Sequence, residues 1–125
     1  MKEGSSMIDH LSLGVSDLAK SKDFYQEALK PLGYQVKLEM EHGVCFGAED
    51  GGDLWIVKSE PSKTHVAFAA KTRELVDSFY QSAMNSGGKD NGAPGLRPHY
   101  HENYYGAFVI DPDGYNIEAV CHKEA

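Results

Sequence analysis

The chain has 125 residues, of which 41% are hydrophobic and 25% are charged, and it carries a formal net charge of −7. This composition is typical of one globular domain with a core of its own, which we expect to span residues 1–125. The acidic balance, without a Lys/Arg cluster, argues against nucleic acid and membrane surfaces as partners, and no apolar run reaches the ~20 residues of a membrane-spanning helix.

The amino terminus and the cysteines favour a cytoplasmic location. The residues around Met1 contain no apolar stretch of the kind that secretory signals carry. Cys45 and Cys121 both lie in apolar, strand-like segments. We interpret them as reduced thiols of a protein core rather than as a disulfide or a reactive nucleophile.

The first half of the chain predicts one strand, one helix and three more strands. Residues 8–15 are short, apolar and partly alternating, as in a strand. From Asp17 to about Lys30 the apolar residues fall on one helical stripe, and Ser16 or Asp17 can cap its start. Further strand-like segments follow at about 34–40, 43–48 and 53–58.

The second half predicts the same order of elements. Residues 64–70 form a strand pattern, and a helical stripe runs from Thr72, its cap, to about Asn85. Strand-like segments follow at about 97–101, 104–110 and 115–121. The sequence therefore predicts the α+β class, with two βαβββ modules at about 7–58 and 64–122, joined through residues 59–62.

Matched residues support the two modules as copies of one unit. A constant spacing of 55 residues separates His10 from His65, and it also relates the aromatic, Ala and Gly positions Phe24/Phe79, Tyr25/Tyr80, Ala28/Ala83 and Gly33/Gly88. Internal repetition of this kind is a strong indication of fold. Towards the end of the modules the spacing becomes 63, with the extra residues near 92–95, so that Glu118 matches Trp55.

Strand alternation places both histidines away from the bulky apolar residues. Successive side chains of a strand point to opposite faces, so His10 and Ser12 lie opposite the large residues that should pack on the helix. His65 takes the equivalent position in the second module. Both histidines have small neighbours on their face, which leaves space for a pocket.

A carboxylate joins the histidines on that face. Glu118 lies between Ile117 and Ala119, and burying it is costly unless a cation satisfies it. His10, His65 and Glu118 form a set that suits one divalent metal ion and leaves positions open for water and substrate. Nitrogen and oxygen ligands do not separate Zn, Mn, Fe and Ni. The alternative is a degenerate site whose polar groups only hydrogen-bond one another. Trp55, at the matching position of the first module, is interpreted as an apolar wall.

Residues 97–105 are the most polar and aromatic stretch of the chain. If 97–101 is extended, Arg97, His99 and His101 share a face. Arg97 could then grip a substrate carboxylate, and His101 or His99 could act as an acid or base. We predict His101 as the catalytic group and Arg97, His99 and Tyr104, with Ser12 and Trp55, as substrate-binding residues. The alternative for this stretch is a solvated hairpin or an aromatic subunit contact.

Three segments resemble the vicinal-oxygen-chelate proteins, the superfamily of glyoxalases, bleomycin-resistance proteins and extradiol dioxygenases. They are IDHLSLGVSD at 8–17 followed by Phe24-Tyr25, THVAF at 64–68, and DPDGYNIE at 111–118. The resemblance implies paired modules that form a curved, partly open barrel-like sheet around a cavity, with the helices outside. It also implies metal-ligating roles for His65 and Glu118, and a homodimer with the site near or across the subunit contact.

One departure from the family pattern bears on the activity. Glyoxalase I resembles this chain but has an acidic or amide ligand where this chain has Trp55, which argues against glyoxalase I activity itself. The three-ligand pattern is closer to extradiol dioxygenases and to fosfomycin-inactivating transferases. Most such dioxygenases are longer, however, and no Lys/Arg cluster for a phosphonate is evident.

The leading hypothesis is a metal-dependent, glyoxalase-like enzyme, of lyase, isomerase or dioxygenase type, whose ion chelates two oxygens of a small substrate. The alternatives are a non-catalytic small-molecule binder on the same fold, with Trp55 stacking on the ligand, and a structural dimer with a vestigial cavity. Bleomycin-sequestering relatives typically lack the metal ligands, so the His/His/Glu set argues against sequestration alone.

Overall fold

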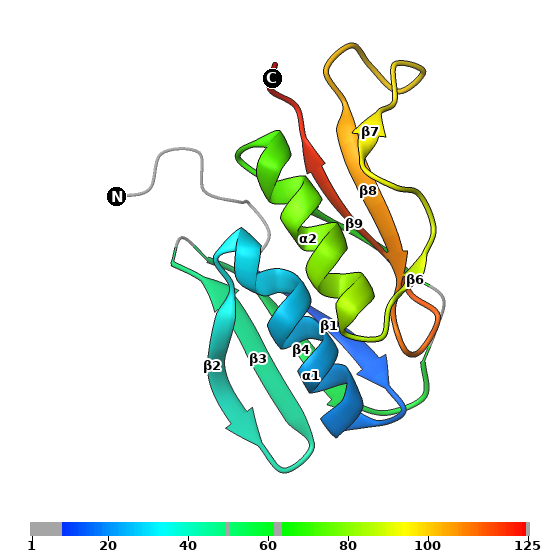
Figure 1. Cartoon of the computed structure of the whole chain (residues 1–125). Coiled ribbons are helices and arrows are strands. Elements are labelled where there is room, and N and C mark those ends of the chain that lie inside the picture. The colour runs from blue at the N-terminus through cyan, green and yellow to red at the C-terminus, as the bar shows by residue number, and fades with distance from the viewer. Residues whose placement is uncertain (1–8, 50, 62–63, 125) are drawn as a thin grey trace.

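The computed structural model describes residues 9–49, 51–61 and 64–124, and its elements follow the predicted order (Figure 1). The first module contains β1 (His10–Val15), α1 (Leu18–Leu29), a 3-10 turn η1 (Lys30–Leu32), β2 (Gln35–Met40), β3 (Gly43–Ala48) and β4 (Gly51–Lys58). The second contains β5 (His65–Ala69), α2 (Arg73–Asn85), β6 (Lys89–Asp90), β7 (Gly95–Leu96), β8 (Tyr105–Ile110) and β9 (Asn116–Cys121). The α+β class is confirmed.

Each module forms one open sheet, and the two sheets have matching topologies. The first has the strand order β1-β4-β3-β2, and the second has β5-β9-β8-β6 with β7 also paired to β8. In both sheets the first strand pairs with the last strand in parallel, and the last strand pairs antiparallel with the strand that precedes it in sequence. Over the described ranges the strands form no closed barrel.

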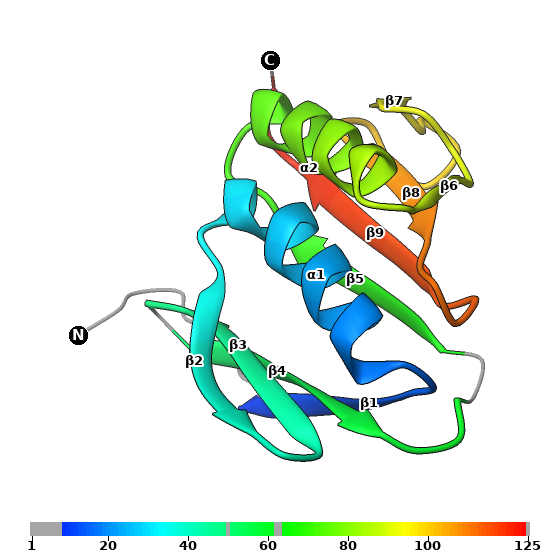
Figure 2. The same ribbon diagram turned by 60° about the horizontal axis from the view of Figure 1, so that its bottom comes forward.

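The two helices lie side by side and cover one face of each sheet (Figures 1 and 2). Leu13 and Val15 of β1, and Val66 and Phe68 of β5, are buried in the core on this face. The opposite face of the strands carries the predicted histidines. Strand alternation thus predicted correctly which residues pack on the helices, apart from Leu11, which is exposed at the start of β1.

Local signals fix the ends of the helices. Asp17 caps α1 by accepting a hydrogen bond from the backbone N–H of Lys20 at 3.1 Å, and Thr72 caps α2 in the same way with Leu75 at 3.2 Å. The first helix ends through η1 at Gly33, whose φ of 89° lies in the left-handed region that glycine tolerates best. Asp17 and Thr72 are therefore confirmed as caps.

The turn before β9 ties the two modules together. The hydroxyl of Tyr25 in α1 donates to Asp111 Oδ2 at 2.5 Å, and both groups are buried. Asp111 Oδ1 accepts the backbone N–H groups of Asp113 at 2.9 Å and Tyr115 at 2.8 Å. Asp113 in turn accepts from Ser16, which follows β1. One carboxylate therefore shapes its own turn and holds the first helix against the second module.

The segment predicted as a strand at 97–101 is a turn instead, and that prediction was wrong. The backbone N–H of Tyr100 donates to the carbonyl of Arg97 at 2.9 Å, which closes a β-turn with Pro98 at its second position. Proline fixes φ near the value this position needs and cannot donate to a strand ladder. Arg97, His99 and His101 consequently do not share a strand face, and β6 and β7 supply the short edge pairing.

Neither cysteine takes part in a disulfide within the described chain. Cys45 and Cys121 are free and buried, and burial raises the pKa of the Cys45 thiol, which makes it a poor nucleophile. No helix among the described residues is long and apolar enough to span a lipid bilayer.

Candidate metal and ligand site

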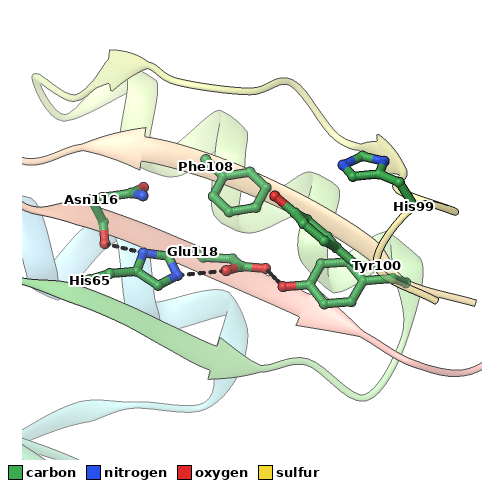
Figure 3. Close-up of a pocket in the computed structure, with 7 residues that line it drawn as sticks. His65, His99, Tyr100, Phe108, Asn116 and Glu118 are labelled. Atoms are coloured by element: carbon green, nitrogen blue, oxygen red, sulfur yellow. Dashed lines mark hydrogen bonds and ion pairs between the residues drawn. The ribbon is translucent and has the colours of Figure 1, made fainter.

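A pocket of about 590 Å³ opens on the face of the second sheet that the helices leave free (Figure 3). Strands β5, β8 and β9 form its floor, and the turn before β8 forms one side. The lining residues are His65, His99, Tyr100, Tyr104, Phe108, Asn116 and Glu118. This volume suits a small organic ligand.

His65 enters the pocket from the first position of β5. Its Nδ1 lies 3.1 Å from the backbone carbonyl oxygen of Asn116, its register partner on β9. A carbonyl oxygen only accepts, so Nδ1 carries a proton and donates it. This contact fixes the ring and directs Nε2 at Glu118, whose Oε1 is 2.9 Å away.

Glu118 lies in the middle of β9 with its carboxylate almost fully buried, at 2% side-chain exposure. Its register partners are Ala67 on β5 and Phe108 on β8. Gly106 leaves the room that the carboxylate occupies, because a Cβ at this glycine would lie 3.2 Å from Glu118 Oε2. The hydroxyl of Tyr104 donates a hydrogen bond to that same oxygen.

The facing atoms of His65 and Glu118 fit a cation. With Nδ1 already donating, a neutral His65 presents the Nε2 lone pair directly to a carboxylate oxygen, which is also an acceptor. The contact is satisfied by a second proton on the ring or by a positive ion bound to both atoms. A neutral imidazole whose other nitrogen donates to a carbonyl, beside a carboxylate, is a typical pair of metal ligands.

Tyr104 acts as a donor in this site. Burial, followed by the hydrogen bond to Glu118, raises the pKa of the Tyr104 phenol well above its ordinary value. A phenol that resists ionisation keeps its proton and steadies the carboxylate rather than removing protons from a ligand.

Aromatic rings form the walls of the pocket. Phe108 lies nearly parallel to the His65 imidazole, with ring centroids 6.1 Å apart. Tyr100 packs edge-on against Tyr104 at 4.8 Å and contacts His99 at 4.3 Å. Tyr100, Phe108 and Asn116 were not predicted from the sequence. Alternation from Glu118 points to Asn116 on the same face of β9, whereas the other two enter through strand pairing and the turn.

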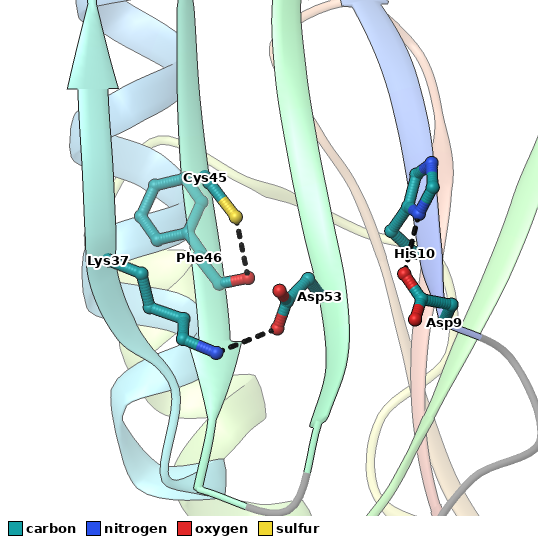
Figure 4. Close-up of polar contacts among 6 residues, drawn as sticks. All are labelled: Asp9, His10, Lys37, Cys45, Phe46 and Asp53. Carbon is teal, nitrogen blue, oxygen red and sulfur yellow. Dashed lines mark hydrogen bonds and ion pairs between the residues drawn. The ribbon is translucent and has the colours of Figure 1, made fainter.

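His10 occupies the equivalent position in the first sheet. It opens β1 as His65 opens β5, and its register partner is Asp53 on β4. Its side chain is 59% exposed and contacts Asp9 Oδ1 at 2.8 Å (Figure 4). His10 does not line the pocket, and no group of three His, Cys, Asp or Glu residues in the described ranges could hold a metal. One chain therefore brings together two of the three predicted ligands.

Ser12 and Trp55 accompany His10 in the first sheet. They are register partners on β1 and β4, as Ala67 and Glu118 are on β5 and β9. The structure thus confirms that Trp55 and Glu118 occupy equivalent places in the two modules. Neither Ser12 nor Trp55 lines the pocket of the same chain.

Arg97 and His101 are engaged beside the pocket. The guanidinium of Arg97 donates to the carbonyls of Gly95 at 2.7 Å and Ala93 at 2.9 Å, and it lies over the Phe108 ring. His101 contacts His122, which follows β9. Of the predicted ligand contacts in this stretch, His99 and Tyr104 line the pocket, while the roles of Arg97 and His101 stay predictions.

Paired modules with matching sheet topologies, and a His–Glu pair on the free face of the second sheet, define the class of α+β protein to which this chain belongs. A family model of the Glyoxalase/Bleomycin resistance protein/Dioxygenase superfamily matches residues 7–119. The chain belongs to this superfamily, as the sequence resemblance predicted.

Solved structures show the same fold. A glyoxalase/bleomycin resistance protein from Albidiferax ferrireducens T118 is 28% identical, with a TM-score of 0.82 over 94% of this chain and 100% of that one. A putative glyoxalase from Bacillus halodurans is 25% identical, with a TM-score of 0.71 over 95% and 96% of the two chains. A lactoylglutathione lyase from Agrobacterium tumefaciens, 17% identical with a TM-score of 0.71 over 95% and 96%, shares the fold alone. No curated protein gives a significant match.

Proposed function

We propose that the chain is a metal-dependent, glyoxalase-like enzyme, of lyase, isomerase or dioxygenase type, that acts on a small molecule offering two oxygens to a divalent ion. The observation that carries the proposal is the approach of His65 Nε2 to Glu118 Oε1 at 2.9 Å inside a ligand-sized pocket. Of the two ways to satisfy these facing acceptor atoms, a second proton on the ring or a bound ion, we propose the ion, since a carboxylate as buried as that of Glu118 is costly without a positive partner.

A second copy of the chain supplies His10 as the third ligand in this proposal. Its exposure and its equivalence to His65 leave it free to reach a partner's pocket, with Ser12 and Trp55 beside it. The free faces of the two sheets would then meet across a homodimer and enclose the ligand. This arrangement agrees with the superfamily resemblance and accounts for the two-ligand site of a single chain.

A bound divalent ion would polarise the substrate oxygens as a Lewis acid and stabilise negative charge on them. His65 and Glu118 would hold it, and Tyr104 would keep the carboxylate oriented. Phe108 and Tyr100 would contact the apolar part of the substrate. His99 lines the pocket, where its imidazole can accept a proton from the substrate or donate one to it.

Tyr104→Phe tests how the carboxylate is held. Removing the hydroxyl leaves Glu118 Oε2 without its donor. Outer contacts of this kind typically contribute about 10–100-fold to metal affinity, so we expect Mn²⁺ or Zn²⁺ to bind roughly tenfold more weakly by calorimetry. The neighbouring Tyr105→Phe is the matched control, because Tyr105 donates to Asp77 at 2.6 Å instead. Equal affinities for both variants would remove Tyr104 from the site.

Subunit complementation tests the shared site. His10→Ala and Glu118→Ala chains, each with a different non-histidine tag, are co-expressed, and the mixed dimers are isolated. Each parent should lose its metal, whereas the mixed dimer keeps one intact site and should bind half of the wild-type metal. A mixture of His65→Ala with Glu118→Ala is the control, since both defects fall in the same half-site and no intact site forms. A mixed dimer of the first kind without metal would overturn the shared site.

A non-catalytic binder is the second candidate, because the pocket walls are aromatic and one chain provides only two metal ligands. If this candidate is correct, aromatic ligands bound in the pocket should quench the fluorescence of Trp55, which a second copy of the chain brings to the pocket, equally well with and without a chelator. Under the enzyme proposal the chelator abolishes the quench.

A further inference from the structure

Two histidines that the proposed function does not use lie against each other at the edge of the second sheet. His101 precedes β8 and His122 follows β9, and the antiparallel pairing of Tyr105 with Cys121 brings these positions together. The Nε2 of His101 lies 2.7 Å from the Nδ1 of His122. The two rings are within 24° of parallel, with centroids 4.6 Å apart.

This contact has the chemistry of a metal-binding pair. Two imidazole nitrogens at hydrogen-bond distance share one proton between two lone pairs. A transition-metal ion can take the place of that proton, because neutral imidazole is a preferred ligand of Cu²⁺, Ni²⁺ and Zn²⁺. Both residues are exposed, so water can complete the coordination. The hard ions Mg²⁺ and Ca²⁺ prefer oxygen ligands and are not expected here.

We propose that His101 and His122 form a second, peripheral site for a borderline transition-metal ion. Among the divalent first-row metals, Cu²⁺ should bind there with the highest affinity. The site shares no ligand with the His65–Glu118 pair, and an ion bound there would link two segments of the chain. It would tie the turn that carries His99 and Tyr100 to the end of β9.

The His101–His122 site adjoins the pocket through one side chain, that of Tyr104. The ring of Tyr104 lies edge-on to both imidazoles, at 5.2 Å from His101 and 5.4 Å from His122. Its hydroxyl donates to Glu118. An ion that fixes the two histidines would therefore also restrict Tyr104 and the rim of the pocket.

The test uses Cu²⁺ alone as the probe, with chain that carries no histidine tag. Calorimetry counts the equivalents bound, and electron paramagnetic resonance reports the number of nitrogen ligands. We expect one equivalent of Cu²⁺ per chain at this site, apart from any that binds in the pocket, with two-nitrogen coupling and an affinity that His101→Ala and His122→Ala each weaken at least tenfold. His42→Ala, which removes a 74% exposed histidine in the β2–β3 turn, should leave this Cu²⁺ in place.

The outcomes separate this proposal from the proposed function. A copper ion that is insensitive to His101→Ala or His122→Ala would overturn the peripheral site, whatever happens at His65. If Glu118→Gln removes a second equivalent of Cu²⁺, that loss concerns the pocket only, and the His101–His122 site is unaffected. Circular dichroism of both alanine variants should match that of the unmodified chain, since each substitution replaces an exposed side chain.

Discussion

Glu118→Gln is expected to remove the divalent ion from the protein while leaving the fold in place. The amide keeps the volume of the buried side chain, and its oxygen can still accept from Tyr104. It loses the negative charge that faces His65 and presents a neutral group to the ion. Because losing an outer-shell partner already costs about 10–100-fold in metal affinity, losing this ligand should cost at least ~100-fold. The metal content of purified protein, measured by mass spectrometry, checks the prediction.

Glu41→Gln is the matched control for this experiment. Glu41 lies in the β2–β3 turn with an 87% exposed side chain, so the same chemical change there should leave the bound metal unchanged. Glu118→Gln protein with wild-type metal stoichiometry would show that the carboxylate is not a ligand.

Asp111→Ala is expected to produce a large loss of stability, although Asp111 lies outside the pocket. The substitution leaves the Tyr25 hydroxyl and the backbone N–H groups of Asp113 and Tyr115 without their acceptor. A buried polar group without a partner costs about 1–3 kcal/mol, so the free energy of unfolding should fall by roughly 3–5 kcal/mol. This is a large share of the ~5–15 kcal/mol of a typical domain. Urea denaturation measures it.

Two further variants separate the causes of that loss. Asp111→Asn keeps one acceptor oxygen for the backbone groups and should cost markedly less than the alanine variant. Asp23→Ala, at an exposed position of α1, should change the stability by no more than about 0.5 kcal/mol. If Asp111→Ala unfolds at the same urea concentration as the unmodified chain, the Tyr25–Asp111 contact does not hold the modules together. Burial raises the pKa of Asp111, and the three donors partly oppose this rise.

The repeat and strand alternation carried most of the prediction from sequence. The 55-residue spacing of His10 and His65 predicted two equivalent first strands, and the registers of β1 and β5 confirm it. The 63-residue spacing predicted the equivalence of Trp55 and Glu118, which the pairing with Ser12 and Ala67 also confirms. Alternation then placed Glu118 on the face of His65, because the period of a strand is fixed by its backbone.

What the sequence did not predict depends on contacts between distant elements. Alternation gives the face on which His10 lies but not how one sheet is placed relative to the other, which follows from packing between α1 and α2 and from the Asp111 turn. The alternation of 97–101 predicts a strand, but Pro98 favours the turn that forms there. The approach of His122 to His101 follows only from the pairing of β8 with β9, to which no sequence motif points.

The most direct measurement is an anomalous difference map from crystals grown with Mn²⁺. We expect a peak within bonding distance of Nε2 of His65 and of the carboxylate of Glu118. The imidazole of His10 from a second chain should complete the set of protein ligands. A map in which His65 and Glu118 still contact each other, with the ion elsewhere or bound to neither residue, would contradict the proposed site.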